Sequence, residues 1–172
     1  MQDPTVTLTT NQVARFAQGY MGGERHDKML KALVMSPWDL PNYLAGSGAL
    51  RSSASDMLKY LLANMRPEGS LAKAIHESHR ELYREPKRIT VAMNWVLSAN
   101  KRHETIIWHN GRMGGASSYL GFTKDGRIGL VILSNVSTDE TDKLGRQLDE
   151  LANPVVSTAQ NAVREPNIDP AP

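Results

Sequence analysis

The sequence predicts an α+β fold in which an antiparallel sheet is flanked by helices. Three observations lead to this prediction. Helical spacing of apolar residues is confined to the first half of the chain and to a segment near its end, whereas residues 90–134 alternate as strands do. Asp125-Gly126 lies between two apolar runs, the strongest short signal of a hairpin between antiparallel strands. The chain has 172 residues, 40% of them hydrophobic, which is enough for one domain with a real core.

The clearest predicted helix runs from Ala54 to Asn64. Ser53 and Asp56 give it an S-x-x-D capping box, and its apolar residues repeat at the i, i+3, i+4 and i+7 positions that form one stripe. Three further helices are predicted, at 11–20, at 71–82 with Ser70 as its cap, and at 139–152 with Ser137 and Glu140 as a capping box. The last helix is expected to turn three leucines inward, namely Leu144, Leu148 and Leu151. Residues 24–50 are punctuated by proline and glycine and are expected to be irregular.

Four strands are predicted in the second half, at Thr90–Leu97, Thr105–His109, Tyr119–Thr123 and Ile128–Ser134. In the first of them apolar residues alternate with smaller or polar ones, as one buried face requires. Met93 belongs to this alternation, so we expect it in the core together with Met57 and Met65. The last strand is almost wholly apolar, which favours cover on both of its faces.

The composition excludes several classes of function. Lys and Arg number 20 and Asp and Glu 18, a net charge of +2 that gives no electrostatic case for a nucleic-acid partner. The chain has no cysteine, which excludes disulfides, thiol catalysis and Cys-ligated metals; we expect neither a metal nor another cofactor. No apolar run approaches the roughly 20 residues of a membrane span. The N-terminus lacks the pattern of a secretory signal, so we expect that the protein stays where it is made or that the chain is a piece of something longer.

Residues 1–153 are expected to form one folded unit followed by a tail. The last 19 residues hold four of the nine prolines and no periodic apolar pattern. The sequence therefore predicts that 154–172 is disordered.

Two motifs in the predicted helix 71–82 allow both a catalytic and an ordinary interpretation. Ser70 and Lys73 are spaced S-x-x-K, which puts a lysine one helical turn from a nucleophilic serine. A serine cap beside a solvated lysine explains the same pattern and is favoured. His76 and His79 could share a metal, but no third ligand is evident and a solvated helix face is favoured.

The stretch from Trp108 to Gly115 has a different character. His109 ends an apolar strand and glycines follow at Gly111, Gly114 and Gly115. Glycines at such a place let a substrate or another backbone come close, and the strand edge can offer backbone N–H groups to an acyl oxygen. A structural histidine whose hydrogen bonds are made within the fold, followed by a glycine turn, explains the local pattern equally well.

Four stretches in a fixed order carry a family resemblance. They are the Gly-rich loop and helix start at 45–57, the strand around Trp95, the motif W-H-N-G with its continuation G-G-A-S-S-Y-L-G-F at 108–122, and the apolar strand ending in asparagine at 128–135. In these stretches the chain resembles the C-terminal half of the class C β-lactamases, the low-molecular-weight penicillin-binding proteins and the β-lactamase-like serine esterases.

The resemblance implies a mixed α/β sandwich of the β-lactamase/transpeptidase type, of which this chain would hold the C-terminal portion only. It also implies a serine hydrolase that acts through an acyl-enzyme. The family's nucleophilic serine and Tyr-x-Asn motif precede the matched region, so both are expected outside this chain. Ser70 and Lys73 fall after the position of that nucleophile and are not expected to act.

The resemblance also assigns candidate site residues. His109 takes the position of a Lys or His that helps to hold the substrate carboxylate and the proton network, and Asn110 follows it. Gly111 lets the strand lie close to the substrate, and the backbone N–H of Arg112 takes the place of the second oxyanion donor. Substrate-binding positions are expected at Gly114, Gly115 and Ser117. Histidine instead of lysine is commoner among the esterase and peptidase relatives.

By this resemblance the substrate would be a small ester, amide or β-lactam, and the partner an N-terminal half or a second copy of the chain. Localisation in the bacterial periplasm or outside the cell is implied on the same ground. Two alternatives remain open. One is a non-catalytic truncated relative that binds a ligand, peptidoglycan or a partner. The other is a complete miniature enzyme that uses Ser70 and Lys73.

Overall fold

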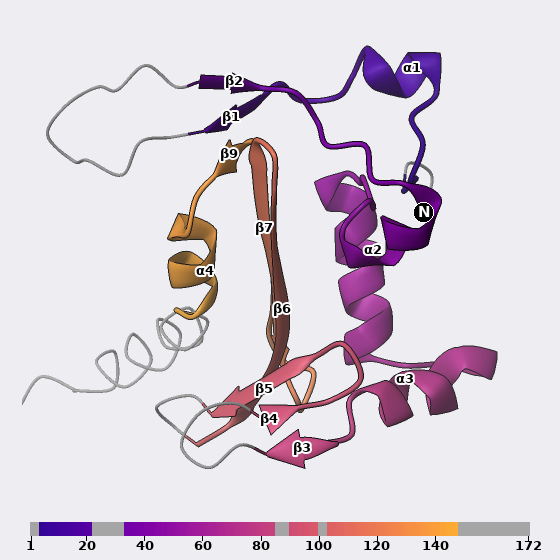
Figure 1. Cartoon of the computed structure of the whole chain (residues 1–172). Coiled ribbons are helices and arrows are strands. Elements are labelled where there is room, and N and C mark those ends of the chain that lie inside the picture. Colours follow the sequence, from indigo (N-terminus) through magenta and orange to yellow (C-terminus); the bar gives the residue numbers. More distant parts are fainter. Residues whose placement is uncertain (1–3, 22–32, 85–89, 100–102, 148–172) are drawn as a thin grey trace, which may run out of the picture.

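The computed structural model describes residues 4–21, 33–84, 90–99 and 103–147. Its centre is an antiparallel sheet of six strands in the order β3-β4-β5-β6-β7-β8. These strands are β3 Tyr83–Arg84, β4 Thr90–Val91, β5 Val96–Ala99, β6 Thr105–Met113, β7 Ala116–Thr123 and β8 Gly129–Ser134. Figure 1 shows α2 (Ala54–Met65) on one side of the long β6–β7 hairpin and α4 (Glu140–Gly145) on the other. The predicted combination of helices and an antiparallel sheet is therefore confirmed.

Shorter elements surround this centre. The helical ones are α1 Thr10–Val13, η1 Asn42–Ser47, η2 Gly69–Leu71 and α3 Ala72–Ser78. A second sheet has the order β2-β1-β9 and consists of β1 Gly19–Met21, β2 Leu33–Met35 and β9 Val136–Ser137. Because β1 runs parallel to β9, which follows β8 directly in the chain, the N-terminal segment is tied to the end of the main sheet. No helix in the described parts of the chain is long and apolar enough to span a bilayer.

The core has two layers, one on each face of the sheet. Between the sheet and α2 lies a cluster that contains Leu61, Trp95, Leu97, Ile107, Leu120 and Phe122. On the α4 side Ile106 and Tyr119 are buried, and Trp108, Ile128, Leu130 and Ile132 pack against them. Both α2 and α4 contact β8, so the predicted cover on both faces of this apolar strand is observed.

Helix α2 begins where its sequence predicts. The hydroxyl of Ser53 accepts a hydrogen bond from the backbone N–H of Asp56 at 3.3 Å, which satisfies one of the free donors of the first turn. The Asp56 carboxylate is buried and pairs with Lys59 at 2.9 Å. The predicted Asp-Gly hairpin also forms, because Gly126 adopts a φ of +69° in the turn that joins β7 to β8.

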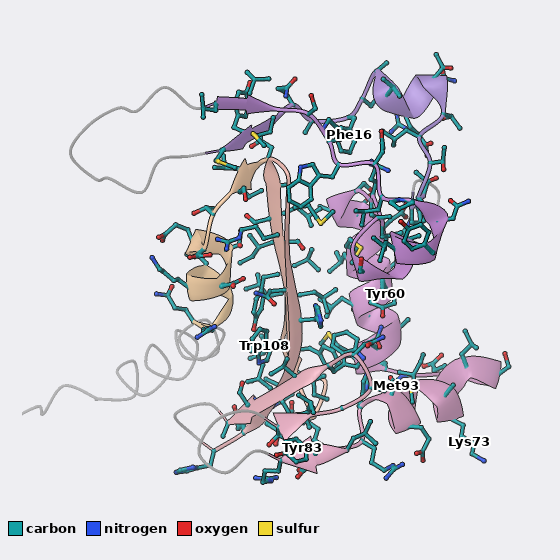
Figure 2. All side chains as sticks on the ribbon, in the orientation of Figure 1. Phe16, Tyr60, Lys73, Tyr83, Met93 and Trp108 are labelled. Atoms are coloured by element: carbon teal, nitrogen blue, oxygen red, sulfur yellow. The ribbon has the colours of Figure 1, made fainter. Side chains whose placement is uncertain are left out.

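Three predictions about the strands and the N-terminal helix are wrong. The segment 11–20 is not one helix: α1 ends at Val13, and Gly19 already belongs to β1. Thr9 caps α1 through a capping box with Gln12. The predicted strand 90–97 is interrupted between β4 and β5 by a turn in which Asn94 has a φ of +58°. Met93 is consequently exposed (Figure 2), whereas Ala92 is buried.

The predicted helix 71–82 is also shorter than expected. The α-helical part ends at Ser78, and Ser70 lies within η2 instead of capping the helix with its side chain. At the other end of the chain, α4 starts after Asp139, not after Ser137, and Leu144 is exposed. Thr141 and Gly145 are the residues of α4 that are buried. The helix ends at Gly145, earlier than predicted, and Arg146 and Gln147 form a turn. Residues 148–152 of the predicted helix and the predicted tail 154–172 lie outside the described residues.

Residues 24–50 contain more structure than their composition suggests. The described part of that stretch holds β2 and the 3-10 helix η1. Both strands of the β6–β7 hairpin extend further towards the connecting turn than predicted, since β6 continues past His109 to Met113 and β7 begins at Ala116. The whole motif singled out in the sequence therefore lies on this hairpin.

Candidate functional site

The pleat of β6 divides the motif between the two faces of the sheet. His109 lies opposite Leu120 of the α2-side cluster, and Gly111 shares that face because it is two residues further along. Asn110 lies opposite Tyr119, which is buried on the α4 side. The side chains of Asn110 and Arg112 therefore leave the strand on the side away from His109.

Part of the β6 backbone faces an edge that carries no neighbouring strand among the described residues. β5 pairs with β6 only as far as Trp108, and the described residues place no strand beside the remainder. Met113 closes the two-residue turn to β7, so Met113 and Gly111 direct their N–H and C=O groups to β7. Asn110 and Arg112 direct theirs to the unpaired side. An acyl oxygen at this edge would meet the N–H of Arg112.

His109 is exposed, and its Nδ1 lies 2.6 Å from the backbone oxygen of Asn110. A carbonyl oxygen can only accept, so Nδ1 must carry the proton of this bond. The neutral imidazole then has its lone pair on Nε2, where it can accept a proton or a hydrogen bond from a ligand.

Three side chains of β6 join the strand to α4. The Asn110 amide donates to the Asp142 carboxylate at 2.6 Å, and Arg112 forms an ion pair with Asp139. The guanidinium of Arg146 lies 5.6 Å from the centre of the Trp108 ring. α4 itself packs on β7 and β8, and these alternate residues of β6 reach successive turns of the helix with their side chains. Figure 2 shows Trp108 on this α4 side of the sheet.

Tyr119 fills the space under α4. Its ring stacks on Trp108 with centres 5.7 Å apart, and it is 1% exposed. Burial raises the pKa of its phenol well above the ordinary value, and Asp142 raises this pKa further against the opposing effect of Arg146. The phenol therefore stays protonated. Gly145 packs on the ring so closely that a Cβ there would lie 2.3 Å from Cγ of Tyr119.

The two serines of the motif lie on different faces. Ser117 is buried, lies opposite Arg112, and donates to the backbone oxygen of Val136 at 2.7 Å. Ser118 lies opposite Gly111 on the face of His109, and a Cβ on residue 111 would be 3.0 Å from its Oγ. Ser118 is a candidate that the sequence analysis missed. The alternation of the strand could have found it, since Ser118 and Gly111 form a cross-strand pair.

The two glycines of the turn are approached by other parts of the chain. A Cβ on Gly114 would lie 2.4 Å from Nε1 of Trp38. A Cβ on Gly115, whose φ is +78°, would lie 2.8 Å from Cα of Gly19, and the backbone oxygen of Gly115 accepts from Tyr20. The glycines predicted that a substrate or another backbone would come close to this turn. They did not identify Trp38, because its position depends on tertiary packing.

The alternative motifs lie elsewhere. Ser70 and Lys73 are exposed at the end of the molecule opposite the β6–β7 turn, and Figure 2 shows Lys73 pointing outward. His79 packs edge-on against Trp95 and Phe122, and its Nε2 lies 3.0 Å from the Asn64 amide oxygen. Burial, and secondarily the neighbouring His76, lower the pKa of His79. No group of three or more His, Cys, Asp or Glu side chains suited to a metal occurs among the described residues.

Comparison with known proteins decides the family. A family model described as Beta-lactamase matches residues 1–153. The chain belongs to the beta-lactamase family. Protein flp of Staphylococcus aureus is 24% identical over 114 residues, which is 64% of this chain and 21% of that protein.

Solved structures of this family share the fold. The octameric penicillin-binding protein homologue from Pyrococcus abyssi matches with a TM-score of 0.70 and 19% identity, over 88% of this chain and 34% of its own. A beta-lactamase/D-alanine carboxypeptidase from Pseudomonas syringae matches with a TM-score of 0.69 and 17% identity, over 89% and 50%. The chain thus spans about a fifth of the curated relative and between a third and half of these two structures. The helices and the antiparallel sheet are those of the β-lactamase/transpeptidase-like fold.

Proposed function

We propose that the chain supplies one wall of a serine hydrolase site of the beta-lactamase family, with the nucleophilic serine coming from outside this chain. One observation carries the proposal. The edge of β6 beyond Trp108 is unpaired among the described residues and directs the N–H of Arg112 outward. A glycine at 111 and an exposed histidine at 109 lie immediately before that donor.

The proposed reaction needs two steps. The serine hydroxyl adds to the carbonyl carbon of an ester, amide or β-lactam, while the carbonyl oxygen accepts from Arg112 N–H. The serine proton passes to the leaving group as the bond to it breaks, and water then hydrolyses the acyl ester. His109 supports this chemistry because the lone pair of its neutral imidazole lies on Nε2, free of the bond made by Nδ1.

The first experiment is the intact mass of the chain after incubation with a reactive penicillin and, separately, a fluorophosphonate. We expect no adduct on the isolated chain and a stoichiometric adduct once an N-terminal half that carries the family's serine is added. Ser70→Ala should leave that adduct unchanged, because Ser70 is exposed and lies in η2, directly before α3, at the end of the molecule opposite the β6–β7 turn. An adduct on Ser70 of the isolated chain would show instead that the chain is a self-sufficient enzyme.

A specific observation also favours a second candidate, a non-catalytic binding module. The side chains of Asn110 and Arg112 are engaged by Asp142 and Asp139 on the face away from His109. This module would bind a ligand or partner and never acquire an adduct, even when such an N-terminal half is present. In either case we propose a second copy or an N-terminal half as the partner, which sedimentation would detect as an assembly larger than 19.0 kDa.

A further inference from the structure

Trp38 occupies the end of the candidate site. The pyrrole part of its indole lies over Gly114, since Nε1, Cδ1 and Cε2 are the atoms that a Cβ on that glycine would meet at 2.4 to 2.9 Å. Any larger residue at 114 would displace the indole. The glycine is therefore needed to seat Trp38.

The backbone that carries this indole is held in place by Arg51. Arg51 donates to the backbone oxygen of Trp38 at 3.0 Å and forms an ion pair with Asp39 at 2.7 Å. The Arg51 side chain is only 12% exposed, and it also donates to the backbone oxygen of Val6 and lies 5.9 Å from the centre of the Phe16 ring. One guanidinium thus fixes the segment that carries Trp38 to two other parts of the chain.

More than half of this indole nevertheless faces solvent. Trp38 is 53% exposed, whereas Trp95 is 7% exposed and belongs to the core. Because the pyrrole edge covers Gly114, the six-membered ring is the part directed away from the hairpin. A flat apolar surface held in one orientation can bind an apolar group with little loss of side-chain entropy.

The position of this surface relative to the strand edge suggests what binds there. Gly114 follows Arg112 by two residues, so the Cα atoms of the two residues lie at most about 7 Å apart. A carbonyl group that accepts from the Arg112 N–H would therefore have the indole within one side-chain length. We propose that Trp38 is a specificity-determining residue that selects substrates with an aromatic or bulky aliphatic group next to the reacting carbonyl. This inference rests on the function proposed above.

The test uses two stable amides that differ only in the apolar group, phenylacetamide and acetamide. The chain is labelled with ¹⁵N, and the three indole N–H signals are assigned from single tryptophan variants. We expect both amides to shift the backbone N–H signal of Arg112. Only phenylacetamide should shift the Trp38 indole signal, and it should bind at least fivefold more tightly than acetamide.

Two variants sharpen the test. Trp38→Leu should reduce the preference for phenylacetamide to less than twofold while the Trp95 and Trp108 signals keep their positions, which shows that the fold is intact. Tyr83→Leu removes an exposed aromatic ring at the opposite end of the molecule and should leave the preference unchanged (Figure 2).

The outcomes separate the inference from the function on which it rests. In one outcome both amides shift the Arg112 signal, but the Trp38 signal does not move or Trp38→Leu keeps the preference for phenylacetamide. That outcome would overturn the role of Trp38 and leave the proposed carbonyl-binding edge of β6 intact. If neither amide shifts Arg112, the edge does not bind carbonyl groups, and both proposals are overturned.

Discussion

The side-chain amide of Asn110 on β6 donates a 2.6 Å hydrogen bond to the carboxylate of Asp142 on α4. This bond joins the strand that carries the candidate site to the helix behind it. Both side chains are partly buried, and their partner atoms are a neutral donor and an ionised acceptor. The middle residue of the motif thus stabilises the sheet from the face opposite His109.

Removal of this bond should destabilise the fold. We expect Asn110→Ala and Asp142→Ala each to lower the free energy of unfolding by about 1–2 kcal/mol. The double variant should lose less unfolding free energy than the two single variants lose together, because the second change removes a group that has already lost its partner. Urea unfolding of the two single variants and the double variant measures this coupling. Strict additivity would show that the bond contributes nothing in solution.

Gly145 should not tolerate even a methyl group. Alanine usually stabilises a helix relative to glycine by about 1 kcal/mol. At 145 its Cβ would lie 2.3 Å from Cγ of the buried Tyr119, so we expect Gly145→Ala to cost about 1–3 kcal/mol, as overpacking does. Gly46→Ala is the matched control, because a Cβ there meets nothing within 4 Å. Thermal melting of both variants would decide, and equal stability would contradict the packing of α4 on Tyr119.

His79 should make the fold less stable in mild acid. Its pKa in the folded chain lies below the ordinary value of 6.5, first because of burial and second because of His76. The unfolded chain therefore takes up this proton at a higher pH than the folded chain. Stability is full above pH 6.5 and decreases as the pH falls below it.

Paired unfolding curves at pH 7.5 and pH 5 test this dependence. His79→Gln can keep a hydrogen bond to Asn64 and should lose much of the acid sensitivity, whereas His76→Gln, which changes an exposed residue, should keep most of it. Equal acid sensitivity of the wild type and His79→Gln would show that other groups cause it.

Asp125 should stabilise the β7–β8 turn except in strong acid. Hydrogen bonds from Thr123 and then from Arg127 lower the pKa of its carboxyl to about 2. This contribution is present above the ordinary value of 3.8 and is lost as the pH falls towards 2. Asp125→Asn should therefore reduce stability at pH 6 by less than about 1 kcal/mol, because the group is exposed. The difference from wild type should vanish near pH 2, and a difference that persists there would show that it is not electrostatic.

Local signals accounted for the predictions that proved correct. Ser53 caps α2 through a bond to a residue three positions away, and Gly126 adopts its turn within a few residues of both strands. Both interactions lie within a short window of sequence, so the pattern of residues is enough to predict them. The motif at 109–112 and the family resemblance were recognised for the same reason.

The errors arose where distant segments decide the outcome. Gly19 could not remain in a helix because it packs backbone to backbone against Gly115 at the hairpin turn. Met93 followed the alternation of a strand, but the turn at Asn94 reversed the chain and left its side chain in solvent. The spacing of apolar residues within each segment predicts neither the packing of Gly19 on Gly115 nor the chain reversal at Asn94.

The sequence by itself determined the α+β class, the start of α2, the β7–β8 hairpin and the residues of the motif. Tertiary structure alone decided that β5 stops pairing at Trp108 and that Trp38 covers Gly114. The physical reason is the range of the interactions. Helix caps, turns and amphipathic stripes depend on residues that are close in the sequence. An unpaired strand edge, and the indole that lies at its end, depend on how segments distant in the sequence pack together.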